Sequence, residues 1–293
     1  YWQQYDWYGV PVAAYYGTKK ACEPIQLIYN YKDFKVYAVN EGKEAKDVVA
    51  TVKIYDAESK MIDEQTCTLS SSYRKTVKAF DLAKFQGIPH FVSLELKDKD
   101  GNFITDNFYC IGAKPNVYDW ENYTWYYTPV TEFTDLRFAF SQPEADVDMK
   151  VEEKDGTYTV TLTNNSPVIS YMNILKAKDS AGNMVVPAYW SDNFFPLLPG
   201  QAKTVTCCAG VKGVRIELDN GNDGLPVMGT STVFDVDVEE ISGLCLNADK
   251  SALISCGDQG VIKQISFEGK VSDVLVYPAD MEGITLHPST GDL

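Results

Sequence analysis

The sequence predicts an all-β protein, made of two tandem Ig-like β-sandwiches plus a truncated β-propeller-like segment. Three observations support this fold class. From Pro24 onward, apolar residues alternate with polar residues at period two. Turn-forming Gly, Asn and Asp residues interrupt these segments at a spacing typical of sandwiches. Beyond residue 240 a different pattern begins, with strands repeating at a period of about 40–45 residues, which is typical of propeller blades.

Length and charge narrow the class of protein. A chain of 293 residues is longer than one core usually serves, so two or three domains are expected. The formal net charge of −15 disfavours binding to the phosphate backbone of nucleic acid. No run of about 18 apolar residues occurs, so we expect no membrane span.

The first sandwich is predicted over residues 24–112. Residues 1–23 precede it, and Lys19–Cys22 are expected to close a helical turn that Pro24 ends. Val48, Ala50, Val52 and Ile54 show the alternation of a half-buried strand, and about seven such strands are expected. Asp81–Lys84 predict a single helical turn between two of them.

An aromatic connector, residues 113–136, is predicted to lead into the second sandwich, residues 137–220. Pro115 and Pro129 bracket the connector. In the second sandwich, the strand over Thr157–Thr163 follows Asp155-Gly156, a pair typical of tight hairpin turns. Further strands are expected over 169–178, 202–207 and 214–218.

The remaining residues predict a linker, 221–240, and partial propeller blades, 241–293. The linker begins with a Gly/Asn/Asp run. Short strands are expected over 241–246, 252–256 and 261–267. The segment 280–286 restates Ile241–Leu246 about 40 residues later, so it is expected to start a second blade.

No catalytic residue is assigned. The chain has two histidines, His90 and His287, and lacks the Gly-x-Ser-x-Gly, Gly-x-x-x-x-Gly-Lys and Gly-x-Gly-x-x-Gly motifs. Paired carboxylates hydrolyse glycosides, but 41 Asp and Glu residues give no means of choosing a pair by spacing. The seven cysteines are scattered and odd in number, which favours small buried side chains over disulfides or a metal site. No cofactor is predicted.

Aromatic side chains are the candidate carbohydrate contacts, namely Trp125, Tyr126 and Trp190. Trp125 and Tyr126 lie in the connector with Trp120 and Tyr127, and these four rings either stack on a sugar or pack one sandwich against the other. Trp190 lies in the segment 188–195, which forms either a sugar contact or a loop shaped by its own Ser, Asp and Asn side chains. These alternatives stay open at this point.

One candidate cation site is predicted in the last segment. Asp280 and Glu282 stand at the start of the second blade-like unit, and carboxylates in such a position can hold a hard metal ion. A single Asp-x-Glu is also common on solvated surfaces.

Several segments resemble family 2 glycoside hydrolases of the exo-β-D-glucosaminidase and β-mannosidase type. They are Tyr5-Asp6-Trp7-Tyr8, the string Gly17–Pro24, the connector Trp125–Pro129 and the loop Pro187–Asn193 with Leu198–Gln201. The resemblance covers residues 1–218. It implies that residues 1–23 are a remnant of the segment closing the catalytic barrel, and that Ig-like domains follow. The catalytic glutamates of the family lie in the barrel, and no residue here matches them. Residues 241–293 are similar to propellers of the phytase-like or SdiA-regulated kind.

The resemblance implies a non-catalytic accessory region of a larger bacterial glycoside hydrolase, acting on β-linked glucosaminides or mannosides. We expect this chain alone to be inactive. Its expected partners are its own catalytic barrel, encoded upstream, and an oligosaccharide. A periplasmic or extracellular location is implied by the resemblance. Two alternatives remain: a carbohydrate-binding module that uses surface aromatics, and a structural surface protein of Ig-like repeats.

Overall fold

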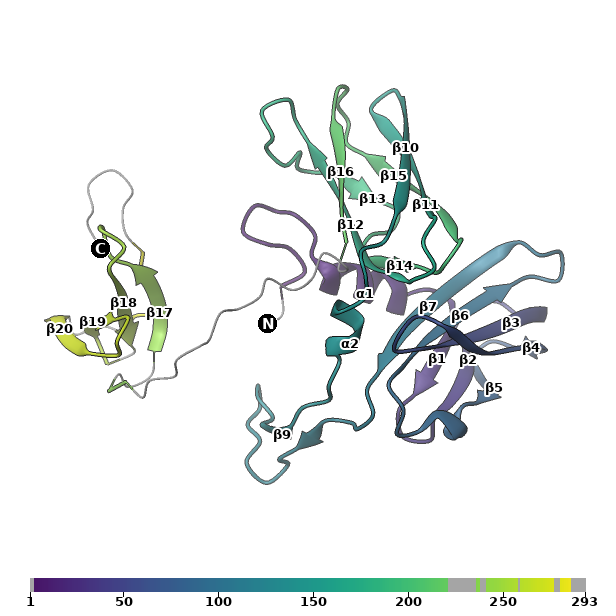
Figure 1. The fold of residues 1–293 in the computed structure, drawn as a ribbon, viewed down its shortest axis with the longest axis horizontal. Helices are drawn as coiled ribbons and strands as arrows, with labels where there is room; N and C mark the ends of the chain where they lie inside the picture. The colour runs from purple at the N-terminus through teal and green to yellow at the C-terminus, as the bar shows by residue number, and fades with distance from the viewer. Residues whose placement is uncertain (1–2, 221–235, 238–240, 258, 277–279, 286–293) are drawn as a thin grey trace. The chain divides into compact units, whose positions relative to one another are not determined.

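The computed structural model describes residues 3–220, 236–237, 241–257, 259–276 and 280–285. It divides into two compact units, residues 1–227 and 228–293 (Figure 1). Unit 1 contains two antiparallel sandwiches and unit 2 contains one antiparallel sheet. The prediction of an all-β protein with tandem Ig-like sandwiches is therefore confirmed.

The first sandwich faces a three-stranded sheet against a four-stranded sheet. The smaller sheet has the order β1 (Ile25–Asn30), β2 (Lys35–Asn40), β5 (Lys75–Asp81). The larger has the order β4 (Met61–Ser71), β3 (Ala45–Asp56), β6 (His90–Lys97), β7 (Phe103–Ile111). These are the seven strands expected from the alternation. The predicted helical turn is the 3-10 helix η1 (Ala83–Phe85).

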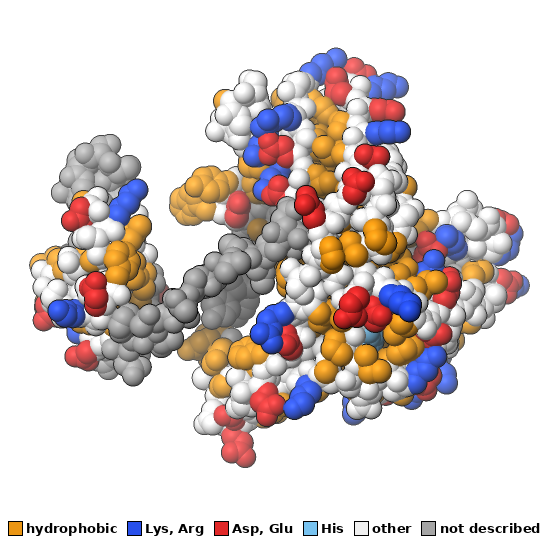
Figure 2. Space-filling model, viewed as in Figure 1, with side chains coloured by type: hydrophobic (Ala, Val, Ile, Leu, Met, Phe, Trp, Pro, Cys, Tyr) orange, Lys and Arg blue, Asp and Glu red, His pale blue; other side chains and the backbone are white. Residues whose placement is uncertain are grey.

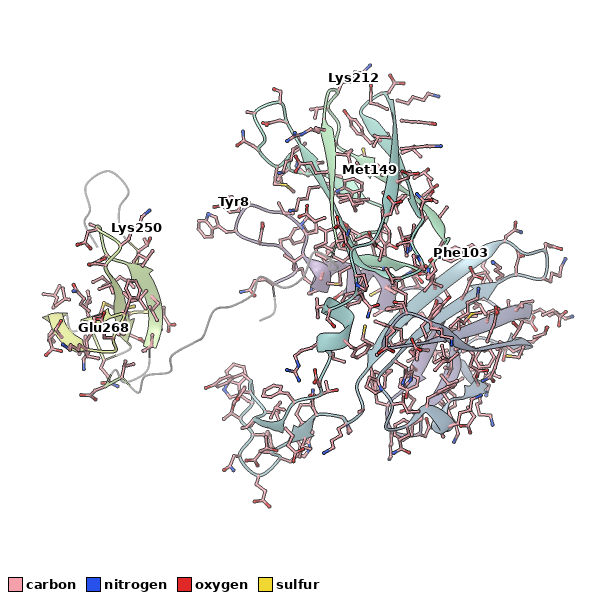
Figure 3. All side chains as sticks on the ribbon, in the orientation of Figure 1. Tyr8, Phe103, Met149, Lys212, Lys250 and Glu268 are labelled. Carbon is pink, nitrogen blue, oxygen red and sulfur yellow. The ribbon has the colours of Figure 1, made fainter. Side chains whose placement is uncertain are left out.

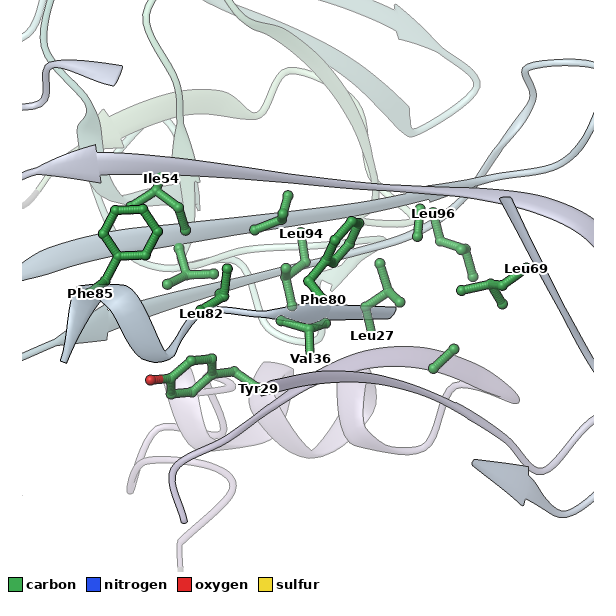
Figure 4. Close-up of a cluster of buried hydrophobic side chains, with 14 of the residues drawn as sticks. Leu27, Tyr29, Val36, Ile54, Leu69, Phe80, Leu82, Phe85, Leu94 and Leu96 are labelled. Carbon is green, nitrogen blue, oxygen red and sulfur yellow. The ribbon is translucent and has the colours of Figure 1, made fainter. Parts of the chain in front are cut away.

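The core of this sandwich lies between its two sheets (Figure 4). Leu27, Val36 and Phe80 come from the three-stranded sheet, and Ile54 and Leu94 come from the four-stranded sheet. Period-two alternation puts every second side chain on the inner face, and burying each one contributes roughly 1.5–3 kcal/mol. The hydrophobic pattern therefore fixes the register of each strand.

The second sandwich follows the same plan. One sheet has the order β10 (Val147–Lys154), β11 (Thr157–Asn164), β15 (Ala202–Cys208), β13 (Tyr189–Trp190), and the other has β14 (Phe195–Leu197), β12 (Ser170–Lys178), β16 (Arg215–Asp219). Asp155 and Gly156 form the predicted turn between β10 and β11, with φ angles of 51° and 77°. Positive φ at both turn positions matches the right-handed twist of the paired strands.

Short elements surround the sandwiches. Helix α1 (Ala13–Ala21) precedes β1 and ends before Pro24, as predicted. The connector holds a small hairpin, β8 (Val117–Tyr118) and β9 (Val130–Glu132), and helix α2 (Arg137–Phe140) follows it. Tyr16 of α1 is buried in the core of the second sandwich, far away along the chain. None of the helices in the described part of the chain has the length and apolar character needed to cross a membrane.

Unit 2 is a four-stranded meander of β17 (Ile241–Leu246), β18 (Ala252–Gly257), β19 (Val261–Ser266) and β20 (Val271–Val276). The three strands expected up to residue 267 are confirmed, and the propeller assignment stays a prediction. Residues 221–235 and 238–240 of the predicted linker, and 286–293 of the predicted blades, lie outside the described residues.

The strand expected over 280–286 is not a strand in its described part, residues 280–285. Met281 and Ile284 instead pack on the apolar cluster of Ile254, Cys256 and Ile262. The backbone of Gly283 and Ile284 passes so close to Gly243 that a Cβ there would lie 2.7 Å from the Ile284 nitrogen. Sequence similarity to β17 therefore did not produce a strand in these residues.

The cysteines only partly follow their predicted role. Cys207 and Cys256 are buried, as expected of small apolar side chains. Cys22 and Cys208 are exposed, which the sequence did not indicate. The two neighbours Cys207 and Cys208 differ because successive side chains of β15 point to opposite faces of the sheet.

Candidate functional site

An apolar cluster joins the two sandwiches of unit 1. Phe91 of β6 packs edge-on against Phe138 of α2, with ring centroids 4.9 Å apart. Ile169, directly before strand β12 of the second sandwich, is fully buried in the same cluster. Tyr171 reaches the rings of Phe91 and Phe140. Helix α2 thus fills the space between the sandwiches with aromatic side chains.

A buried polar bridge crosses the same junction. Ser59, in the β3–β4 turn at a φ of 66°, donates its hydroxyl to Oε1 of Gln142 at 2.6 Å. The same hydroxyl accepts the backbone N–H of Ile169 at 3.0 Å. Gln142 donates in turn to the carbonyl of Ala57 at 2.6 Å. Because a buried polar group without a partner is costly, this bridge fixes the relative position of the two sandwiches.

Charged side chains from both sandwiches and α1 meet at Asp106 of β7. Lys20 of α1 contacts one oxygen of Asp106 at 2.7 Å, and Lys203 of β15 contacts the other at 3.2 Å. Lys203 also pairs with Asp192 at 2.7 Å and lies over the ring of Phe195 at 4.7 Å. Lys19 donates to the carbonyls of Trp190 and Ser191 at 3.2 and 2.5 Å. We call Lys20, Asp106, Lys203 and Asp192 the junction ion network.

The network changes the acidity of its members. Burial disfavours the charged form of Asp106, but the charges and hydrogen bonds of Lys203 and Lys20 outweigh it and lower the pKa of Asp106 below 3.8. Burial likewise opposes the charge on Lys20, and Asp106 outweighs it and raises the pKa of Lys20 above 10.5. Both groups are therefore charged at neutral pH.

A groove of about 1000 Å³ runs beside this network. It lies between the outer face of β3, β6 and β7 and the β14–β15 turn of the second sandwich, with α1 forming another part of its wall. Phe103, which is 57% exposed, lines the groove (Figure 3).

The carboxylates that line this groove are Glu95, Asp106 and Asp192, and each pairs with a lysine. A glycosidase needs one carboxyl group whose pKa is raised, so that it can donate a proton. The pKa of Asp106 is lowered instead. Asp106 therefore lacks the raised pKa expected of a carboxyl group that donates a proton.

The β8–β9 hairpin is held together by polar interactions of its own loop. Asp119 accepts the backbone N–H groups of Glu121 and Asn122 at 3.0 and 3.1 Å, and the Asn122 amide at 2.7 Å. Thr124 donates its backbone N–H to the Tyr127 carbonyl at 2.7 Å. These bonds build an Asx turn followed by a second tight turn. The loop is thus shaped without a hydrophobic core beneath it.

The rings of this hairpin face outward. We call the exposed rings of the hairpin the aromatic hairpin surface, made of Tyr118, Trp120, Tyr123, Trp125, Tyr126 and Tyr127. Trp125 is 85% exposed and packs edge-on against Tyr126, with ring centroids 5.0 Å apart. Tyr118 and Trp120 form a second pair at 5.7 Å. Clusters of exposed aromatic side chains are a common feature of interaction surfaces.

Of the three predicted carbohydrate contacts, two are exposed and one is buried. Trp125 and Tyr126 are exposed, so the alternative that they pack one sandwich against the other is wrong within the described residues. Helix α2 and Ile169 fill that role. Trp190 is only 7% exposed and belongs to the core of the second sandwich, which leaves no open ring face for a sugar.

The loop around Trp190 is structural, as one of the two alternatives held. The Asn193 side chain accepts the N–H of Leu175 at 2.8 Å and donates to its carbonyl at 2.9 Å. It thus takes the place of a neighbouring strand beside β12. A second exposed aromatic segment is the loop at Trp7 and Tyr8, visible as a hydrophobic cluster in Figure 2 and marked by Tyr8 in Figure 3.

The predicted cation site stays a prediction. Asp280 and Glu282 are both exposed. Among the residues that the structure describes, no three His, Cys, Asp or Glu side chains lie close enough to hold a metal ion.

The sequence did not indicate the junction ion network, because its members come from α1, β7, β15 and the loop after β13, which adjoin only in the folded chain. Tyr123 was also not predicted as a sugar contact. The alternation of Tyr118, Trp120 and Tyr123 with Asp119, Glu121 and Asn122 was a readable signal, since a buried segment rarely alternates rings with charges.

Residues 125–223 match the family described as the exo-beta-D-glucosaminidase Ig-fold domain. An exo-beta-D-glucosaminidase of Arthroderma benhamiae is 32% identical over 205 residues, which are 68% of this chain and 23% of that protein. One from Amycolatopsis orientalis is 29% identical over 241 residues, covering 76% and 23%. The chain therefore spans about a quarter of the length of the curated relatives it matches.

Solved structures agree. The crystal structure of the Amycolatopsis orientalis exo-chitosanase matches 76% of this chain and 28% of that chain, with a TM-score of 0.67 and 28% identity. A beta-D-mannosidase from Dictyoglomus thermophilum matches 75% of this chain at a TM-score of 0.53 and 17% identity, which is a likeness of fold alone.

Proposed function

From the premise that residues 125–223 carry an Ig-fold domain of the exo-β-D-glucosaminidase type, we propose that this chain is a non-catalytic accessory region of a family 2 glycoside hydrolase. In this proposal its two sandwiches brace a catalytic barrel encoded upstream. The enzyme acts on β-linked glucosaminides, with mannosides as the second candidate, and it works in the periplasm or outside the cell.

The observation that carries the proposal is the extent of the structural match. It covers 76% of this chain but only 28% of the exo-chitosanase chain. The chain thus corresponds to a minor part of such a protein. The chemistry of the groove supports an accessory role, because its carboxylates are paired with lysines and Asp106 has a lowered pKa.

The junction supports the bracing role. Helix α1 directly precedes the first sandwich and contacts both sandwiches. Lys20 bonds to the first sandwich, and Lys19 bonds to the second. These contacts hold α1 against both sandwiches, and the Ser59–Gln142 bridge holds the two sandwiches together. Because α1 is bonded to both sandwiches, a domain that precedes it would be held in a fixed position relative to them, as bracing requires.

The test of non-catalysis is a hydrolysis assay on this chain. We expect chitosan oligosaccharides, an aryl β-D-glucosaminide and an aryl β-mannoside to be turned over no faster than in buffer. Turnover that a point substitution within residues 25–218 abolishes would contradict the proposal.

A second test separates this proposal from a structural surface protein of Ig-like repeats. We expect the coding sequence upstream of Tyr1 to encode a barrel that carries two glutamates at its strand ends. Further sandwiches there, with no barrel, would favour the structural protein instead.

A further inference from the structure

We propose that the aromatic hairpin surface binds oligosaccharides of β-linked glucosamine in their cationic form. The inference rests on the proposed function, because it takes the sugar class from it. It adds a binding site on this chain, carried by Trp120, Tyr123, Trp125 and Tyr126, with Glu121 and Glu132 as partners for the ammonium groups.

The rings are presented in a fixed arrangement. Trp120 and Trp125 are 68% and 85% exposed, and each has a tyrosine neighbour at a ring distance of 5.7 or 5.0 Å. The Asp119 carboxylate and the Thr124–Tyr127 backbone bond hold the loop between them. A loop that is already ordered loses little conformational entropy when a ligand binds.

The charge of the hairpin is complementary to an amino sugar. Between Lys114 and Arg137 the sequence has the carboxylates Asp119, Glu121, Glu132 and Asp135 and no Lys or Arg. An ammonium group is attracted both to the face of an indole or phenol ring and to a carboxylate.

Two of these carboxylates already have partners. Asp119 bonds to its own turn, and Asp135 pairs with Arg137 at 2.6 Å. The exposed Glu121 and Glu132 are therefore the ones we assign to the ligand.

The distribution of polar groups favours a sugar over a protein partner. Asp119, Glu121, Asn122 and Thr124 alternate with the rings from Tyr118 to Trp125. Closing a protein surface over the hairpin would desolvate these groups, and a buried carboxylate without a partner is costly. A sugar chain keeps them hydrated or hydrogen-bonded while its C–H faces cover the rings. Docking of a protein domain is accordingly the rival outcome of the test.

The test is titration calorimetry of this chain with glucosamine hexasaccharide at about pH 5.5, where the sugar amines are protonated. N-acetylglucosamine hexasaccharide is the neutral comparison with the same β-linked chain. We expect the cationic hexasaccharide to bind more tightly, and its affinity to fall as NaCl is raised from about 20 to 500 mM because salt screens exposed charges.

Variants locate the site. We expect Trp125→Ala to weaken binding by about five-fold or more, and Glu121→Gln to weaken it about three-fold while flattening the salt dependence. Trp7→Ala is the matched control, because Trp7 is 95% exposed but lies outside the hairpin. It should bind as the unsubstituted chain does. Unfolding curves of all three variants should coincide, since the side chains are exposed.

Three results would overturn the inference. They are no heat with either hexasaccharide, equal binding by Trp125→Ala, or equal and salt-independent binding of the two sugars. The first result would leave protein docking as the use of this surface. None of them bears on whether the chain is an inactive accessory region, because the hydrolysis assay and the upstream coding sequence test that separately.

Discussion

Asp106 accepts Lys20 on one carboxylate oxygen and Lys203 on the other, at 2.7 and 3.2 Å. Lys20 precedes it by 86 residues and Lys203 follows it by 97. The side chain of Asp106 thus joins helix α1, the first sandwich and the second sandwich. Because these three side chains are less than a third exposed, their attraction is only weakly screened by solvent.

Replacing this carboxylate should destabilise the chain. Asp106→Asn removes the counter-charge that two partly buried lysines share and leaves them only Glu23 and Asp192 as ion-pair partners in the described part of the chain. We expect a loss of about 1–3 kcal/mol in the free energy of unfolding. Urea denaturation measures it. Asp100→Asn is the control, because Asp100 is 64% exposed and pairs only with its neighbour Lys99. Equal effects of the two substitutions would show that the junction ion network adds no stability.

The ion pairs of Asp106 also predict that the stability of the chain depends on pH. The folded pKa of Asp106 lies below its ordinary value of 3.8. Its contribution is therefore present above about pH 4 and is lost as the pH falls through the lowered folded value. The stability difference between the unsubstituted chain and Asp106→Asn should be constant from pH 7 to 5 and should shrink below pH 4. A difference that persists unchanged at pH 2.5 would contradict it.

His90 predicts a second pH dependence, at higher pH. Desolvation by burial lowers its pKa below 6.5, and its bond from Nδ1 to the Ile88 carbonyl at 2.6 Å only partly offsets this. Its Nε2 is buried and has no hydrogen-bond partner in the described part of the chain. The unfolded chain therefore binds the proton more readily, so stability should decline as the pH falls below about 6.5.

The measurement is urea denaturation between pH 7 and 5. His90→Gln cannot titrate there, so its stability should change less over this range than that of the unsubstituted chain. His287 is present in both proteins, so its own titration cancels from the comparison. Parallel curves would show that His90 is protonated equally easily in both states.

Replacing Ser59 should lower the free energy of unfolding by more than the loss of an exposed serine hydroxyl would. Ser59→Ala removes a hydroxyl that bonds to both Gln142 and the Ile169 N–H. With these buried groups left unpaired, we expect a loss of about 1–3 kcal/mol in unfolding free energy, read from thermal or urea unfolding. Ser72→Ala, at an exposed serine in another turn of the same sandwich, should change stability by less than about 0.5 kcal/mol.

Asp119 tests whether the hairpin is ordered before a ligand arrives. Asp119→Ala removes the acceptor of the Glu121 and Asn122 N–H groups. Hydrogen exchange at these two amides should become faster, while global stability stays unchanged because the loop lies outside the hydrophobic clusters. Affinity for glucosamine hexasaccharide should fall several-fold. Faster exchange without a loss of affinity would mean that the order of the loop does not contribute to binding.

Much of the fold was readable from local pattern. The alternation around Val48–Ile54 predicted a strand with one buried face, and Asp155-Gly156 predicted a tight turn, because both depend on neighbours a few residues away. The repeat at 280–286 misled, since similarity to β17 says nothing about whether a partner strand is within reach.

The sequence by itself determined the all-β class, the strands of the first sandwich, several strands of the second and the aromatic character of the connector. These follow from residue type and spacing along the chain. Only the tertiary structure decided that Trp190 is buried while Trp125 is exposed, and that Asp106 meets Lys20 and Lys203. Burial and ion pairing depend on which distant segments come together in the folded chain.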